Sequence, residues 1–271
     1  MLMLKTLFLI LTISLSALNA SAQRSSPPSK SELAEITERG RQLAAYDVAA
    51  WYATDAVMAM NPAEGSVARY LAKKTDNGWV VVFGRFNEKR DKFLVVYEAS
   101  QGASPREFNV KKYETPKEDT GFYLSAAKAI ETALADFRGE ARPYNIAVLP
   151  AKSAQMYVYV VPAQIKQGVY PLGADARYLV SQDGSKILEK RQLHKSIIEF
   201  TASPGAQNIE GGFHTAVLDD IPEDTDVFHV LARKPSVPEW IATQQYVYRI
   251  EADGTINYVM TREAFLKMRE K

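Results

Sequence analysis

The segment from Asp175 to Phe200, DARYLVSQDGSKILEKRQLHKSIIEF, constrains the fold most, because it has the pattern of a long β-hairpin. Asp183-Gly184 separates two runs of alternating apolar residues. This dipeptide favours a type I′ turn, in which both central residues need positive φ. The turn predicts two facing pairs: Val180 with Ile187, and Leu179 with Leu188. Asn77-Gly78 and Asp253-Gly254 lie in similar surroundings, so we expect antiparallel sheets built from successive hairpins.

Two main helices are expected to pack on these sheets. Ser29, with Glu32 three residues later, fits a capping box and predicts a helix that runs to about Met60, where Asn61-Pro62 ends it. Ser125 is expected to cap a second, alanine-rich helix over 126–137. Strand-forming runs follow each helix, rich in β-branched and aromatic residues. The sequence therefore predicts an α+β fold of antiparallel hairpin sheets and two main helices.

The order of these elements predicts how the chain is divided. The predicted segments are a signal peptide over 1–22, an N-terminal helix with a β-meander over 23–100, a loop or linker over 101–122, and an α+β C-terminal domain over 123–271. The 101–122 segment is assigned to a linker because it is polar and irregular, with one short strand pattern at 107–113.

The first residues predict export. Met1–Lys5 is a short basic region, 6–18 is apolar, and Ala20-Ser21-Ala22 has the small residues of a cleavage site after Ala22. The apolar run is shorter than the roughly 20 residues that span a bilayer. No other stretch of the sequence is long and apolar enough to do so. We therefore expect a soluble mature protein, without a transmembrane segment, in a periplasm or outside the cell.

Composition removes several classes of function. The chain has no cysteine, which excludes disulfides, thiol nucleophiles and Cys-ligated metal sites. Without the leader and its one cation, Lys5, the chain carries 32 positive and 32 negative charges. This balance gives no overall attraction to nucleic acid, so no nucleic-acid partner is expected. The common nucleophile, P-loop, dinucleotide and H-E-x-x-H motifs are also absent.

All three histidines lie in the last third of the chain. The stretch Glu210–Arg233 reads as two strands joined by an acidic loop, in a register that places His214 opposite His229. Facing side chains in that register would be close enough to share a zinc ion. Asp226 points to the other face of the strand, so this register supplies no third ligand. His194 lies among Lys190, Arg191 and Lys195, a run more typical of a solvated strand face than of a site for an anionic polymer.

Gly212-Phe213-His214-Thr215, followed by Pro222 and Asp226, resembles the zinc-site signature of JAMM/MPN-type metallopeptidases. The strands expected over 238–256 resemble those that follow the signature. The resemblance implies that His214 and Asp226 are metal ligands. The family's second histidine falls on Ala216 and its serine on Glu223, departures that imply loss of the zinc chemistry. The candidate metal ligands are thus His214, Asp226 and His229.

The unit of helix, strands and Asp-Gly hairpin in the middle of the chain resembles the PepSY module of secreted proteins, which implies a non-catalytic interaction domain. We therefore expect an exported binding protein that needs no cofactor and whose partner is a protein or a cell-wall component. The alternative is a zinc-dependent hydrolase of peptide or amide bonds that uses the His214 region. Metal bound at His214 with a third ligand would separate the two.

Overall fold

The computed structural model describes Arg24 and residues 26–201 and 210–269. The predicted signal peptide and its cleavage site therefore lie outside the described residues. Within the described part, the fold is α+β, as the sequence predicts. The helices are α1 (Lys30–Met58), α2 (Phe122–Asp136), α3 (Asp224–Ala232) and α4 (Arg262–Arg269).

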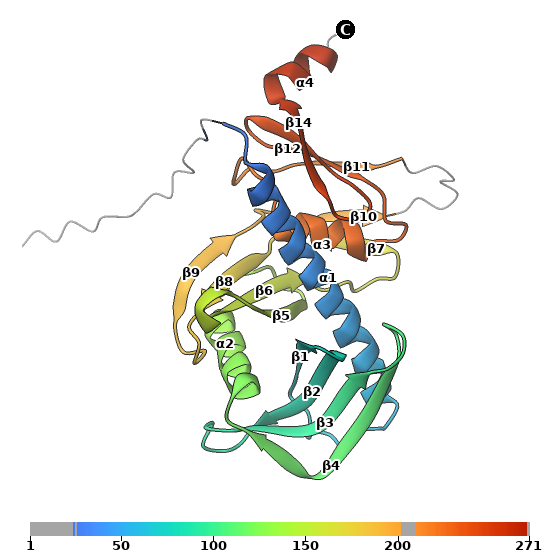
Figure 1. Cartoon of the computed structure of the whole chain (residues 1–271), viewed down its shortest axis with the longest axis vertical. Helices are drawn as coiled ribbons and strands as arrows, with labels where there is room; N and C mark the ends of the chain where they lie inside the picture. The colour runs from blue at the N-terminus through green and yellow to red at the C-terminus, as the bar shows by residue number, and fades with distance from the viewer. Residues whose placement is uncertain (1–23, 25, 202–209, 270–271) are drawn as a thin grey trace, which may run out of the picture.

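Three four-stranded sheets and one two-stranded sheet accompany these helices (Figure 1). The first sheet is a meander of β1 (Arg69–Thr75), β2 (Gly78–Phe86), β3 (Phe93–Gln101) and β4 (Phe108–Asp119). The second has the order β5 (Tyr144–Pro150), β6 (Met156–Pro162), β8 (Ala176–Val180) and β9 (Ile187–Gln192). The third has the order β11 (Gly212–Thr215), β12 (Glu239–Ala242), β13 (Tyr246–Ile250) and β14 (Ile256–Thr261). The pair consists of β7 (Val169–Leu172) and β10 (Ile198–Thr201).

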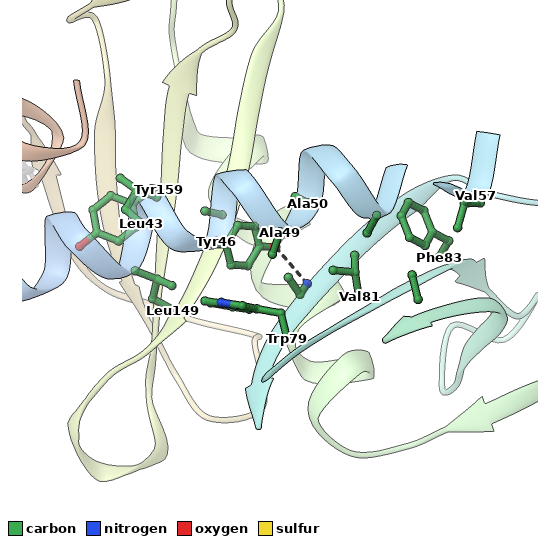
Figure 2. Packing of buried hydrophobic residues seen from close by; sticks show 14 of the residues in the cluster. Leu43, Tyr46, Ala49, Ala50, Val57, Trp79, Val81, Phe83, Leu149 and Tyr159 are labelled. Atoms are coloured by element: carbon green, nitrogen blue, oxygen red, sulfur yellow. Dashed lines mark hydrogen bonds between the residues drawn. The ribbon is translucent and has the colours of Figure 1, made fainter. Parts of the chain in front are cut away.

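Helix α1 begins with the predicted capping box, since the Ser29 hydroxyl accepts from Glu32 N–H and the Glu32 carboxylate accepts from Ser29 N–H. Its apolar stripe packs against the first two sheets. Figure 2 shows Tyr46 of this stripe by Trp79 of β2, and Leu43 by Tyr159 of β6. Helix α2 covers the opposite faces of the same two sheets. Burial on both faces explains why their central strands are nearly continuous apolar runs.

These two clusters cross the predicted boundary between 23–100 and 123–271. The cluster under α1 joins Val81 of the first sheet to Tyr159 of the second, and the start of α1 packs on the third sheet through Leu33 and Ile36. The predicted division of the chain is therefore not a division of the hydrophobic core.

The predicted linker over 101–122 is wrong for most of its length, because 108–119 forms β4. This strand pairs with β3 from Gln101↔Phe108 to Phe93↔Asp119, with a register shift between them. Most residues of β4 are exposed at the edge of the sheet. The strand therefore has a polar sequence that resembles that of a loop. Helix α2 also begins earlier than predicted, at Phe122, because the Asp119 carboxylate accepts from Leu124 N–H.

The hairpin over 175–200 forms with a different turn. Val180 pairs with Ile187 as predicted, but a register shift places Glu189 opposite Leu179, in place of Leu188. Gly184 has a φ of +77°, and its N–H donates to Ser181 O, so the turn spans the four residues from Ser181 to Gly184. Ser181 N–H donates to Lys186 O, which closes a four-residue loop in place of a two-residue type I′ turn. After Gln192 the chain leaves this sheet, and β10 pairs with β7.

Candidate functional site

The first turn of α3 is where the second sheet, the third sheet and α1 meet. Its N-cap is Glu223, whose N–H donates to Asp226 Oδ2 at 2.7 Å, so the two residues form a capping box. Glu223, Asp224 and Asp226 are all buried. Carboxylates favour a helix N-terminus electrostatically, but buried ones need partners as well. The chain provides a separate set of cations for each of them.

Asp224 connects three elements. Its carboxylate accepts from Arg39 Nε of α1 at 3.0 Å and from the Tyr159 hydroxyl of β6 at 2.8 Å, and it also accepts from Arg177 of β8. The Asp224 residue is 0% exposed. Its neighbour Glu223 is bound in a similar way by Arg191 of β9. The start of α3 is thereby fixed to α1 and to the second sheet.

Asp226 lies between two imidazoles. Its Oδ1 is 3.0 Å from His194 Nε2 and 3.1 Å from His214 Nε2. His194 follows β9, His214 lies on β11, and Asp226 is in the first turn of α3. The fold thus brings together three side chains that the sequence places on separate elements.

The remaining ring nitrogen of each histidine contacts another buried carboxylate. His194 Nδ1 is 2.9 Å from Asp175 Oδ1, and His214 Nδ1 is 3.0 Å from Glu239 Oε1. The other Glu239 oxygen accepts from Arg233 Nη1 at 2.6 Å. The result is a buried row in which carboxylates and imidazoles alternate.

The charges in this row balance when both imidazoles are protonated. Burial by itself would lower the pKa of His194, but the Asp175 and Asp226 carboxylates raise it well above its usual value. For His214, burial again lowers the pKa, but the neighbouring carboxylates, Asp226 most strongly, raise it to about 9. Three carboxylates then face two imidazolium ions and Arg233. One divalent cation in place of the two Nε2 protons would give the same net charge.

The cluster of His194, His214 and Asp226 fits a zinc ion. One ligand atom from each residue lies within 4.8 Å of the other two. His214 Nε2 is buried and has no hydrogen-bond partner among the described residues, because its 3.1 Å approach to Asp226 lacks hydrogen-bond geometry. Carboxylates on the far nitrogens, here Asp175 and Glu239, are typical of zinc-bound histidines. All three candidate ligands are buried, whereas a catalytic zinc needs a position open to substrate.

Of the three ligands expected from the sequence, the structure brings together His214 and Asp226. His229 does not face His214 across a hairpin, because 224–232 is a helix and His214 pairs with Ile241 of the parallel strand β12. The ring centroid of His229 lies 4.5 Å from that of Phe200, and burial together with the Arg233 charge lowers its pKa to about 3. His194, interpreted as part of a solvated face, takes the third place.

A cavity of about 1200 Å³ lies apart from this cluster, where α1, the edge of the first sheet and the β5–β6 connection meet the start of α2. Trp79 of β2 and Leu149 of β5 form part of its apolar wall. Figure 2 shows these two side chains close together beside α1. No local sequence pattern indicates this cavity, because its walls come from distant segments.

A second cavity of about 630 Å³ contains Asp47 in its wall, together with Trp51 and Tyr170. Burial raises the pKa of Asp47 to about 6. In the unfolded chain Asp47 ionises near 3.8, so the contribution of this group to stability is fully present below that pH and is lost as pH rises through about 6. We expect the unfolding free energy of Asp47→Asn, measured relative to that of the natural chain, to be about 2 kcal/mol higher at pH 8 than at pH 4. Urea unfolding at both pH values measures this, with exposed Asp55→Asn as the control; a gain that does not depend on pH would contradict the assignment.

Comparisons with known proteins found no match to a protein-family model, to a curated protein or to a solved structure. Among the described residues, no helix has the length and apolar character needed to cross a membrane.

Proposed function

We propose that this chain is an exported, non-catalytic binding protein of the cell envelope or extracellular space, and that the large cavity is its ligand site. The cavity volume carries the proposal. Sites for small ligands are usually about 300 to 1000 Å³, so this cavity of about 1200 Å³ is large enough for one. Its lining combines apolar residues, such as Trp79 and Leu149, with polar and charged ones, such as Gln42 and Lys74. The export pattern in the sequence supports the location.

A neutral fluorescent probe, N-phenyl-1-naphthylamine, tests the cavity. Ala45 lines the large cavity and the adjacent Ala44 lines the smaller one, so Ala45→Trp fills the proposed site and Ala44→Trp is its matched control. We expect saturable binding that Ala45→Trp weakens at least about tenfold and Ala44→Trp leaves unchanged. Absence of saturable binding, or equal loss in both variants, would refute the site.

A metal-dependent hydrolase of peptide or amide bonds is the second candidate, favoured by the cluster of His194, His214 and Asp226. A bound zinc ion would supply a Lewis acid there. Asp175 and Glu239 would hold the Nδ1 protons and fix the orientation of the two imidazoles. The burial of all three ligand residues favours a structural role for such a metal over catalysis.

The zinc content of chain purified without a histidine tag tests this cluster. We expect close to one zinc per chain, with affinity reduced at least about tenfold in His194→Gln and in His214→Gln. His229→Gln is the control, since this buried histidine is not among the three grouped residues. Equal zinc retention in all variants would exclude the cluster. Zinc-dependent cleavage of peptides would replace the binding proposal with the hydrolase.

A further inference from the structure

Two lysines lie at the cavity where β1 forms the edge of the first sheet. Lys73 and Lys74 are successive residues of β1 and point to opposite faces of it. Lys73 Nζ lies 5.1 Å from the centre of the Phe122 ring, and Lys74 is opposite Trp79 in the strand register. Both rings line the cavity with the lysines. The Lys73 ammonium group therefore lies next to an aromatic part of the wall, and Lys74 is the cross-strand neighbour of another.

Neither ammonium group has a carboxylate partner within ion-pair distance among the residues that the structure describes. The other charged groups of the wall are already engaged. Arg41 binds Asp253 and Thr255, Glu38 accepts from Gln42, and Asp183 holds its own turn through Ser181 and Ser185. Lys73 and Lys74 are thus the cations of the wall that remain available to a ligand.

The start of α2 also borders the cavity, and two of its N–H groups are already bound. The Asp119 carboxylate already accepts from Gly121 N–H and Leu124 N–H. Lys73 and Lys74 are therefore the cations that an anionic group in the cavity would meet. The wall next to them is apolar, with Val148, Leu149 and Met156 from the second sheet. Methionine adapts to ligands of irregular shape, and lysine stems extend along apolar surface with the charge at the end.

We propose that the ligand of this cavity is a single-chain anionic amphiphile. Its carboxylate or phosphate lies at the exposed edge of β1, where the long Lys73 and Lys74 side chains reach it from either face of the strand, while its apolar chain contacts Trp79, Leu149 and Met156. The proposal rests on the binding function proposed above. It adds the chemical class of the ligand. The shared chemistry of an alkyl carboxylate and an alkyl phosphate is one anionic group on an apolar chain.

Displacement of N-phenyl-1-naphthylamine from the full mature chain tests the class. Palmitate, dodecyl phosphate and the uncharged hexadecanol are compared on the natural chain and on Lys73→Gln, Lys74→Gln and the double variant. Lys111→Gln is the control, because Lys111 lies on β4 away from the cavity wall. We expect palmitate to displace the probe at least about tenfold better than hexadecanol, and each lysine substitution to reduce this advantage about fivefold. A larger effect on dodecyl phosphate than on palmitate would identify the phosphate as the preferred head group.

The outcomes separate this inference from the function on which it rests. Failure of the probe to bind refutes the cavity as a ligand site, and the ligand class with it. Probe binding with equal displacement by palmitate and hexadecanol overturns only the anionic class. The same holds if the double lysine variant keeps the full preference for palmitate, or if Lys111→Gln loses as much of it as the other variants.

Discussion

Replacing Asp224 with asparagine should lower the free energy of unfolding by about 3 to 5 kcal/mol. The carboxylate is fully buried and accepts from Arg39, Arg177 and the Tyr159 hydroxyl. Asparagine keeps the shape but removes the charge, so the largely buried Arg177 would lose its counter-ion and Arg39 would keep only its longer contact with the exposed Glu35. Breaking one side of a buried ion pair is much more costly than the net contribution of the pair, because the charge that remains is not compensated.

Equilibrium unfolding in urea, followed by circular dichroism, measures this loss. The matched control is Asp253→Asn, which removes a carboxylate paired to Arg41 where both side chains are largely exposed. Such a surface pair should contribute less than about 1 kcal/mol. Equal destabilisation by the two substitutions would contradict the role of Asp224 as the connection between α1, the second sheet and α3.

The substitution Gly40→Ala should destabilise the chain by about 1 to 3 kcal/mol, although alanine is the better helix former. Gly40 lies in α1 where this helix crosses α3. A Cβ atom there would come within 2.4 Å of Val227 Cβ and 2.6 Å of Asp224 O. Neither neighbour can give way easily, since one is a helix backbone atom and the other a buried branched side chain. The two helices would have to separate.

Thermal unfolding of Gly40→Ala, compared with Glu35→Ala at an exposed position of the same helix, measures the cost of this close approach. The Glu35 substitution should change stability by no more than about 0.5 kcal/mol. A Gly40→Ala variant more stable than the natural chain would show that α1 and α3 do not pack as closely as described.

Local signals account for the parts of the fold that the sequence predicted. The capping box at Ser29 and Glu32 defined the start of α1, and the Gly turns with alternating apolar runs located most of the strands. β4 was missed because an exposed edge strand carries few apolar residues. α3 is not predicted from the sequence, because 220–223 is interpreted as an acidic loop and Asp226 as part of the strand that follows it, although Glu223 and Asp226 form a capping box.

The site was predictable only in part, for a related reason. His214 and Asp226 could be selected from their resemblance to a known signature. Their contact with His194 depends on the chain leaving the second sheet after Gln192 and passing beside α3. The charged neighbours of His194 are typical of a solvated strand face. No local sequence pattern indicates that the chain leaves the second sheet after Gln192. The capping-box pattern of Glu223 and Asp226 is the sequence signal from which Asp226 could have been assigned to the start of a helix.

Resolved indole N–H signals in a proton–nitrogen NMR spectrum give the most direct test of the cavity as the ligand site. The chain has three tryptophans, of which Trp79 lines the large cavity and Trp51 the smaller one, while Trp240 lies on β12. On titration with N-phenyl-1-naphthylamine, the account predicts a saturable shift of the Trp79 signal, with those of Trp51 and Trp240 unchanged. A shift of the Trp51 signal alone, or no shift at saturating probe, would contradict it.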